Sequence, residues 1–169
     1  VATGDNYSWP DSPMSDGAVA LDLSTGKILW HSQLTPKDVW TVACAADDKS
    51  NCPDDAGPDY DFGQAPALFT ARAATGTKIE LVGAGQKSGQ YWALDAASGQ
   101  ILWSAAPGPG STLGGIEWGP ATDGKRIYVA ETNFAGIPYT TPSGQTLHGG
   151  SWAALDPKSG RILWQIADP

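Results

Sequence analysis

Long apolar runs, helical periodicity and basic side chains are all scarce in this sequence of 169 residues. No stretch approaches the roughly 18 apolar residues of a membrane-spanning helix, so we expect no membrane span. No long 3.6-residue periodicity is present, and 21 Gly and 13 Pro interrupt the chain, which argues against a helical fold. Lys and Arg number 10 against 18 Asp and Glu, so we expect no nucleic-acid partner.

Cysteine is also rare, since Cys44 and Cys52 are the only two. A zinc site would need further Cys or His ligands nearby, and His31 and His148 lie far away in the sequence. Two free thiols are the alternative, but a local disulfide formed in an oxidising compartment is favoured. The sequence therefore predicts a periplasmic or secreted protein.

One segment type occurs three times, at residues 19–30, 92–103 and 153–164. Each copy has a short apolar run, an Asp, two further residues, Ser/Thr-Gly, and a second apolar run that ends in Trp. Asp can hydrogen-bond the backbone that follows it, and Gly accepts a positive φ without steric strain. Each copy is therefore predicted to be a β-hairpin with a tight turn.

The Asp and Trp of the repeat are predicted to be structural. A carboxylate that recurs at every turn serves the turn and not catalysis; these are Asp22, Asp95 and Asp156. The large Trp rings are expected to pack between neighbouring blades; these are Trp30, Trp103 and Trp164.

Further strand candidates lie between the repeats, at residues 65–70, 78–83, 116–121 and 126–132. Each interval then carries about four strands, the content of one β-propeller blade with loop insertions. The predicted fold is all-β: residues 1–34 form the back half of a blade, 35–106 a full blade and 107–169 another. About two and a half to three blades cannot close a ring, so we expect the chain to be a fragment of a larger propeller.

The repeat Ala-x-Asp-x-x-Thr/Ser-Gly-x-x-x-Trp resembles the tryptophan-docking motif of propeller dehydrogenases that use pyrroloquinoline quinone. Four further segments resemble that family in the same order: a Thr-Gly-Asn calcium loop, a Thr-Pro-x-Asp-x-Trp blade start, a Lys-Asn-Gly strand start and a Gly-Gly-x-Asn-Trp pocket segment. They lie at residues 3–8, 34–40, 85–89 and 114–118. The resemblance covers nearly the whole chain and implies an eight-bladed quinoprotein-type β-propeller.

Within that family, residues 40–44, 52–53 and 59–63 are similar to polyvinyl-alcohol dehydrogenases, which join the propeller to a cytochrome c domain. No Cys-x-x-Cys-His motif is present, so any haem c lies on a domain outside this chain. The resemblance implies a periplasmic oxidoreductase that acts on a small-molecule or polymeric alcohol. Its expected cofactors are pyrroloquinoline quinone (PQQ) and Ca²⁺, and its expected partners are a cytochrome c electron acceptor and the remaining propeller blades.

The resemblance also implies roles for single residues. Asp5 and Asn6 offer oxygen ligands to Ca²⁺; which of them reaches the metal is open, and a turn at a strand end is the alternative. Lys87 is expected to contact the quinone oxygens and stabilise charge during reduction, with an exposed turn lysine as the alternative. Glu117 stands where the family has Asn, and Trp118 is expected at the cofactor pocket or between blades.

The general base departs from the family pattern. Methanol-type dehydrogenases carry Asp directly after the Trp of the second segment, where this chain has Thr41. Threonine cannot accept a proton at neutral pH, so Asp61, or else Asp59, is predicted to be the base. The alternative for both is an acidic, solvated loop, and Asp38 is the weaker candidate, expected to serve as a loop or cap residue.

Two other functions stay open beside the dehydrogenase. One is a non-catalytic propeller such as the scaffold lipoprotein of outer-membrane β-barrel assembly, because the repeat alone suits either. The other is a quinoprotein homologue that has lost activity, which the missing Asp at position 41 allows. The segments between the repeats, around Lys87, Glu117 and the two cysteines, favour the enzyme.

Overall fold

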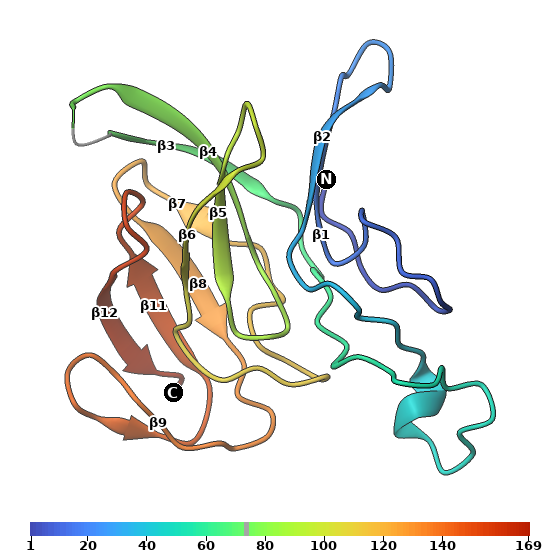
Figure 1. Cartoon of the computed structure of the whole chain (residues 1–169). Helices are drawn as coiled ribbons and strands as arrows, with labels where there is room; N and C mark the ends of the chain where they lie inside the picture. Colours follow the sequence, from blue (N-terminus) through green and yellow to red (C-terminus); the bar gives the residue numbers. More distant parts are fainter. Residues whose placement is uncertain (73–74) are drawn as a thin grey trace.

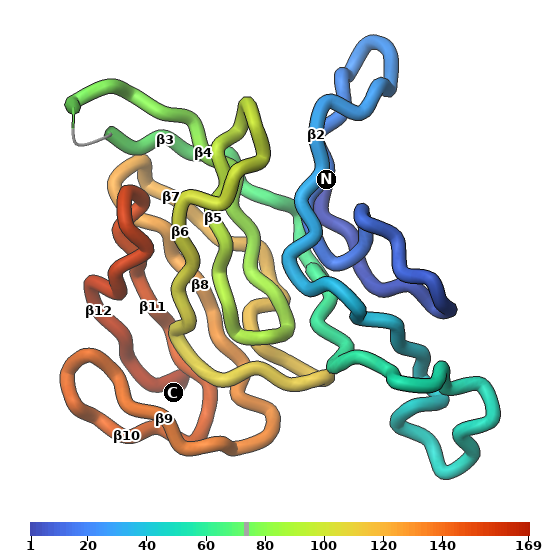
Figure 2. Tube along the Cα trace, viewed as in Figure 1, coloured from blue at the N-terminus to red at the C-terminus, as the bar shows by residue number. Residues whose placement is uncertain are grey.

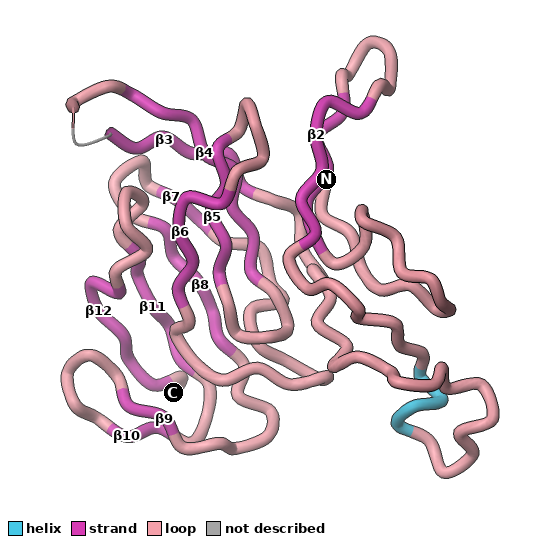
Figure 3. Tube along the Cα trace, viewed as in Figure 1, coloured by secondary structure: helices cyan, strands magenta, loops and turns pink. Residues whose placement is uncertain are grey.

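The computed structural model describes residues 1–72 and 75–169, and its regular elements are strands apart from one 3-10 turn, η1 (Val42–Ala45) (Figures 1 and 3). The hairpin β1–β2 stands alone at the N-terminal end of the chain; its strands are Gly17–Leu21 and Ile28–Gln33. The predicted all-β class is confirmed. No helix in the described part of the chain is long and apolar enough to cross a membrane.

Two four-stranded antiparallel sheets follow the hairpin. The first has the order β3-β4-β5-β6, with strands Ala67–Arg72, Lys78–Gly85, Tyr91–Asp95 and Ile101–Ala105. The second has the order β12-β11-β8-β7, with strands Ile162–Ala167, Ser151–Leu155, Ile127–Glu131 and Ala121–Thr122. A small ribbon of β9 (Tyr139–Thr140) and β10 (Thr146–Leu147) lies in the connection between β8 and β11.

The predicted strands near 65–70, 78–83 and 126–132 are confirmed as β3, β4 and β8. The strand predicted at 116–121 was wrong, because only Ala121–Thr122 pairs with β8. Pro120 has no N–H to donate to a ladder. Ile116 instead lies fully buried in a loop, and its N–H donates to the carbonyl of Gln86 at 3.0 Å.

The turn of each repeat is built as the sequence predicts. In the β5–β6 hairpin, the Asp95 carboxylate accepts hydrogen bonds from the N–H groups of Ala97 and Ser98, and Gly99 has a φ of +73°. The Asp22 carboxylate accepts the equivalent pair of N–H groups in the first turn, and the Asp156 carboxylate accepts the N–H of Lys158 in the third. The prediction that these Asp residues serve their turns is confirmed.

Each of the first two repeat tryptophans docks on the turn of the next sheet. The indole N–H of Trp30 donates to the carbonyl of Ala96, and that of Trp103 donates to the carbonyl of Pro157, both at 3.1 Å. Their rings lie against the turn glycines Gly99 and Gly160, where no Cβ would fit. Packing between neighbouring units is thereby confirmed for these two tryptophans.

Trp164 differs from the other two repeat tryptophans, because 41% of its surface is exposed in this chain. Its ring contacts Tyr128 of its own sheet, with centroids 6.1 Å apart. Its docking on a further blade stays a prediction.

The hydrophobic core lies between the two four-stranded sheets, whose traces run against each other in Figure 2. Leu81 and Tyr91 of the first sheet and Ile127 and Leu155 of the second belong to this single buried cluster. Tyr91 also stacks on Trp103, with ring centroids 5.8 Å apart. The core that joins the two sheets therefore extends to Trp103, the tryptophan that docks on the second sheet.

The tryptophan contact can be tested at three equivalent turn glycines of this chain. Gly26, Gly99 and Gly160 all have φ near +70°, but only Gly26 has nothing within 4 Å of its missing Cβ. Alanine at any of them should destabilise by about 1–2 kcal/mol through the left-handed backbone. Gly99→Ala and Gly160→Ala should cost about 1–3 kcal/mol more, because the methyl group meets an indole ring. Urea unfolding measures this difference, and equal losses at all three positions would contradict the docking.

One buried carboxyl group generates a pH prediction. Glu131, at the end of β8, is 3% exposed, and neither of its oxygens has a hydrogen-bond partner among the described residues. Burial raises its pKa from an ordinary value near 4.5 to about 8. The folded chain therefore holds a proton that the unfolded chain releases, so the free energy of unfolding falls as the pH rises from about 4.5 to about 8.

The variant Glu131→Gln should lose this contribution to the pH dependence. Relative to wild type it should gain a few kcal/mol of stability at pH 9, while at pH 4 the two should be similar. Urea unfolding at both pH values measures the difference. The same stability difference at pH 4 and pH 9 would show that Glu131 does not titrate in this way.

Candidate functional site

A cavity of about 390 Å³ lies where three loops meet the end of β4. It is lined by Asp5, Tyr7, Trp40, Thr41, Val42, Asp59, Asp61 and Lys87. The first two loops are joined by the hydrogen bond from the Trp40 N–H to the Asn6 carbonyl, at 3.0 Å. The third is joined to β4 by the hydrogen bond from the Lys87 N–H to the Asp61 carbonyl, also 3.0 Å. These two hydrogen bonds bring residues that are distant in the sequence together around the cavity.

Gly4 allows the first and third loops to approach closely. A Cβ at this position would collide with the Asp61 carboxylate. The N–H of the next residue, Asp5, donates to Oδ1 of Asp61 at 2.8 Å. The absence of a side chain at Gly4 thus lets the backbone of Asp5 reach the carboxylate of Asp61.

Lys87 bridges two carboxylates of the cavity. Its Nζ lies 2.9 Å from Oδ1 of Asp59 and 2.8 Å from Oδ2 of Asp61, and its side chain is 16% exposed. This position excludes the alternative of an exposed turn lysine. Burial alone would lower the pKa of Lys87, but the hydrogen bonds to Asp61 and Asp59 hold it above its usual value. The group is therefore a permanent cation.

Asp59 and Asp61 do not belong to a solvated loop. Asp59 is 3% exposed and has a left-handed backbone with a φ of +63°. The Asp38 carboxylate holds this segment, because it accepts the N–H groups of Asp59 and Tyr60 at 3.0 and 2.7 Å. The loop role predicted for Asp38 is confirmed by these contacts.

The two carboxyl groups that contact Lys87 differ in acidity. Burial raises the pKa of Asp59 above its usual range, although Lys87 opposes the shift. Burial also favours a higher pKa for Asp61, but hydrogen bonds from Lys87 and from the Asp5 N–H hold it below its usual range. Asp61 is therefore the more firmly ionised of the two.

A group of three carboxylates lies behind the lysine. One oxygen each of Asp5, Asp16 and Asp61 lies within 4.8 Å of the others. Burial raises the pKa of Asp5 to about 10, with help from neighbouring Asp16 and Asp61, and burial raises that of Asp16 to about 7. Asp16 was missed in the sequence, where it stands in an ordinary Ser-Asp-Gly stretch with no motif around it.

This group meets the chemical requirements of a hard cation. Oδ1 of Asp5 is buried without a hydrogen-bond partner among the described residues. Carboxylate oxygens are the ligands that Ca²⁺ prefers, and a cation would supply the interaction that this oxygen lacks. Asn6, the other predicted ligand, does not line the cavity, and its Nδ2 is buried without a partner in the described part of the chain.

The other predicted site residues lie outside this cavity. Glu117 packs against Gly63, with its carbonyl oxygen 3.5 Å from the position of a Cβ there. Trp118 is 69% exposed and lines a separate depression of about 210 Å³ beside Glu131. Neither residue is among those that line the cavity around Lys87, and their roles at the cofactor stay predictions.

The predicted disulfide between Cys44 and Cys52 is present. It closes the loop that begins at Thr41, whose hydroxyl donates to the carbonyl of Asn51 at 3.0 Å. Thr41 thus holds the disulfide loop in place at the edge of the cavity.

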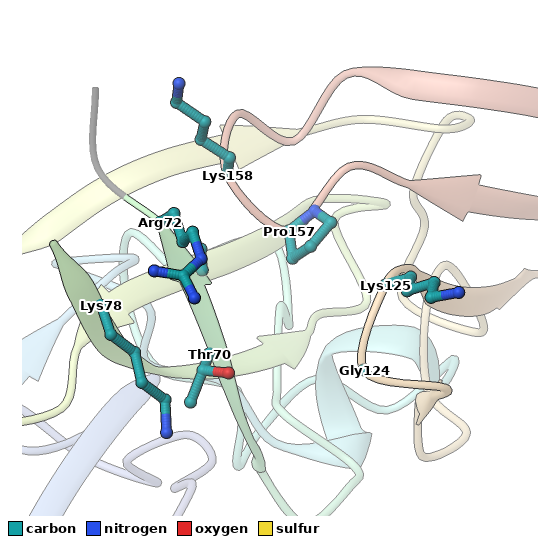
Figure 4. Close-up of a pocket in the computed structure, with 8 residues that line it drawn as sticks. Thr70, Arg72, Lys78, Gly124, Lys125, Pro157 and Lys158 are labelled. Atoms are coloured by element: carbon teal, nitrogen blue, oxygen red, sulfur yellow. The ribbon is translucent and has the colours of Figure 1, made fainter. Parts of the chain in front are cut away.

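A second depression, of about 380 Å³, is lined by Thr70, Ala71, Arg72, Lys78, Gly124, Lys125, Pro157 and Lys158 (Figure 4). Its cations do not converge, because Lys78, Lys125 and Lys158 point in different directions, away from one another (Figure 4). Arg72 is instead engaged with the carbonyl of Gly76 at 3.0 Å. The described residues of this surface thus offer no convergent group of polar atoms to a ligand.

Known proteins resemble the chain in sequence. The family model PQQ_2, described as outer membrane protein assembly factor BamB, matches residues 15–169. Polyvinylalcohol dehydrogenases from Pseudomonas sp and Sphingopyxis sp. (strain 113P3) are 35% and 36% identical to it, over 76% and 98% of this chain. The aligned regions are 19% and 25% of those relatives, so the chain spans about a fifth to a quarter of their length.

The fold has a solved counterpart. The crystal structure of quinohemoprotein alcohol dehydrogenase from Comamonas testosteroni matches with a TM-score of 0.65 and 17% identity, over 98% of this chain and 32% of that one. At this identity the likeness concerns the fold alone. Together with the sequence matches, it shows that the chain belongs to the quinoprotein (PQQ-type) alcohol dehydrogenase propeller family, together with the polyvinylalcohol dehydrogenases.

Proposed function

We propose that the full-length protein is a quinoprotein dehydrogenase that oxidises alcohols with PQQ and Ca²⁺. The observation that carries the proposal is the Asp59–Lys87–Asp61 bridge, which lies in a cavity beside carboxylate oxygens without partners. Burying a lysine and several aspartates costs stability unless each charge is paired. A purely structural blade has no need of this arrangement, whereas a redox site does.

The quinone, when bound, supplies the carbonyl carbon that accepts a hydride from the alcohol, and Ca²⁺ supplies a Lewis acid for that carbonyl. Lys87 would hold the quinone oxygens. An ammonium group has three hydrogen-bond donors, and Asp59 and Asp61 use two of them. The third has no acceptor among the described residues, so it could donate to the cofactor and stabilise negative charge on it.

Asp59 is the stronger candidate for the general base that accepts the hydroxyl proton. Both oxygens of Asp61 are engaged, Oδ1 with the Asp5 N–H and Oδ2 with Lys87. In the described part of the chain Asp59 accepts from Lys87 through Oδ1, and its carboxylate otherwise contacts the carboxyl group of Asp5. With Asp5 bound to a cation, the other oxygen of Asp59 would be available for a proton, while Asp61 is placed to orient Lys87 and to bind the cation.

The rim of the cavity supports a bulky or polymeric alcohol as substrate. Tyr7 and Val42 stand at its edge with 77% and 78% of their surfaces exposed. Apolar groups in this open position could contact a carbon chain that extends beyond the reacting carbon. Polyvinyl alcohol or another secondary alcohol is the substrate class we propose, as the names of the two dehydrogenase relatives suggest for those proteins.

The compartment and the partners are part of the same proposal. The disulfide between Cys44 and Cys52 supports a periplasmic or secreted protein, because disulfides persist in oxidising compartments. A cytochrome c is the proposed electron acceptor, with any haem c carried outside this chain. The remaining propeller blades would complete the cofactor pocket, to which Glu117 and Trp118 would then contribute.

A scaffold role in outer-membrane assembly is the second candidate. It is favoured by the description of the matching family model, which covers the repeats. The repeat alone does not decide between the two, since one fold supports both functions.

The roles of the two aspartates can be separated by substitution. In the full-length protein loaded with PQQ and Ca²⁺, Asp59→Asn should lower kcat for alcohol oxidation about 10²–10⁴-fold and leave Ca²⁺ affinity within about threefold. Asp61→Asn should lower both. Dye-linked activity and calorimetric Ca²⁺ titration measure these effects, with the exposed Asp47→Asn as control. If only Asp61→Asn abolishes turnover and Ca²⁺ still binds, Asp61 is the base.

Lys87 can be tested against a second lysine near the same strand. Lys87→Ala removes the cation beyond the end of β4, whereas Lys78→Ala removes an exposed cation at its start. The first should weaken PQQ binding at least tenfold, because a buried donor to the cofactor is lost. The second should leave binding unchanged.

Quenching of tryptophan fluorescence during PQQ titration measures both affinities, and thermal melting checks that each variant is folded. Unchanged affinity of a folded Lys87→Ala variant would remove this residue from the cofactor site. Failure of the wild-type protein to oxidise alcohols after reconstitution would favour the scaffold.

A further inference from the structure

Asp16 is fully buried and rigidly held directly before β1. Its N–H donates to the carbonyl of Gly4 at 3.2 Å, and its own carbonyl accepts the N–H groups of Leu34 and Thr35 at 2.9 and 3.2 Å. Its φ of +47° lies in the left-handed region, which is uncommon for a residue with a side chain. The backbone therefore fixes the direction of this side chain at some cost in conformational energy.

The fold itself does not use the Asp16 carboxylate. Neither of its oxygens accepts a hydrogen bond from an N–H or hydroxyl group among the described residues, and the carboxyl group of Asp5 is near enough to share a proton with it. A carboxylate buried without a partner costs stability, and the three backbone hydrogen bonds of Asp16 would form equally with an asparagine. The side chain thus occupies a position where its charged form destabilises the protein on its own.

The Asp16 carboxylate lies near two other carboxylates, and Oδ1 of one of them, Asp5, is also buried without a partner among the described residues. One oxygen of Asp16 lies within 4.8 Å of oxygens of both Asp5 and Asp61. Two oxygens that each lie about 2.4 Å from a Ca²⁺ ion can be at most about 4.8 Å apart, and every pair of these three oxygens meets that condition for a shared ion. Lys87 is the only cation within salt-bridge distance of the three in the described part of the chain, and it contacts Asp61 alone of them.

We propose that Asp16 is a third protein ligand of the cation, so that Asp5, Asp16 and Asp61 bind it together. The identity of the cation as Ca²⁺ rests on the proposed function. Asp16 does not line the cavity, so it would reach the ion from the interior of the protein. The side of the ion that faces the cavity then stays open to cofactor and substrate. Asp16 would accordingly set cation affinity without contacting the alcohol.

Calorimetric titration of Ca²⁺ into the full-length protein, freed of metal by a chelator and without PQQ, tests this role. Asn is the suitable substitution, because it is nearly isosteric and tolerates a left-handed backbone. Asp16→Asn should weaken Ca²⁺ binding at least tenfold, whereas the exposed Asp47→Asn should bind as wild type does. The metal-free Asp16→Asn protein should melt at the same temperature as wild type or higher, because a buried carboxylate has been removed.

Two outcomes would overturn the proposal. The first is a folded Asp16→Asn protein with wild-type Ca²⁺ affinity. The second is a lower melting temperature of the metal-free variant, which would show that the side chain supports the fold instead.

Asp5→Asn separates this inference from the proposed function. Weaker Ca²⁺ binding in Asp5→Asn but not in Asp16→Asn would leave the metal site and the dehydrogenase in place and reject Asp16 alone. If wild type binds no Ca²⁺ yet oxidises alcohols with PQQ, the three-carboxylate site is rejected and the activity stands.

Discussion

The docking of an indole ring on the turn of the next sheet is the contact on which the arrangement of the chain depends. Trp30 and Trp103 each reach from the end of one hairpin to the following Asp-led turn, donate to its backbone and cover its glycine. A contact that recurs with each repeat sets the same relation between successive units. The ends of the strands therefore recur at equivalent positions from one unit to the next, and the loop that carries Asp61 joins the end of β4 through the Lys87 N–H.

The candidate site and the repeat contribute in opposite ways to the stability of the fold. The repeat lowers the free energy of the fold through apolar burial and satisfied turns. Around Lys87, several carboxylates are instead taken out of water, and Asp5 and Asp16 keep oxygens without partners in the described residues. Such groups weaken a fold unless a ligand pairs them. Binding of a divalent cation to the site would therefore stabilise the protein.

The sequence predicts local features better than long-range ones. The Asp-x-x-Ser/Thr-Gly turns, strands β3, β4 and β8 and the disulfide depend on nearby residues, and all are present. The strand predicted at 116–121 was wrong because Pro120 and the burial of Ile116 against Gln86 replaced pairing by loop packing. The family pattern pointed to Lys87, Asp59 and Asp61, but it did not show that the two aspartates bind the lysine.

The sequence by itself determined the all-β class, the repeat unit and the family, because periodic apolar runs, turn chemistry and motif order are written along the chain. Only the tertiary structure decided which carboxylates meet. Asp5, Asp16 and Asp61 are up to 56 residues apart, and they converge because Gly4 leaves room for Asp61 and the left-handed backbone of Asp16 turns its side chain inward. Burial and proximity depend on the whole packing, so no local pattern of residues could have shown them.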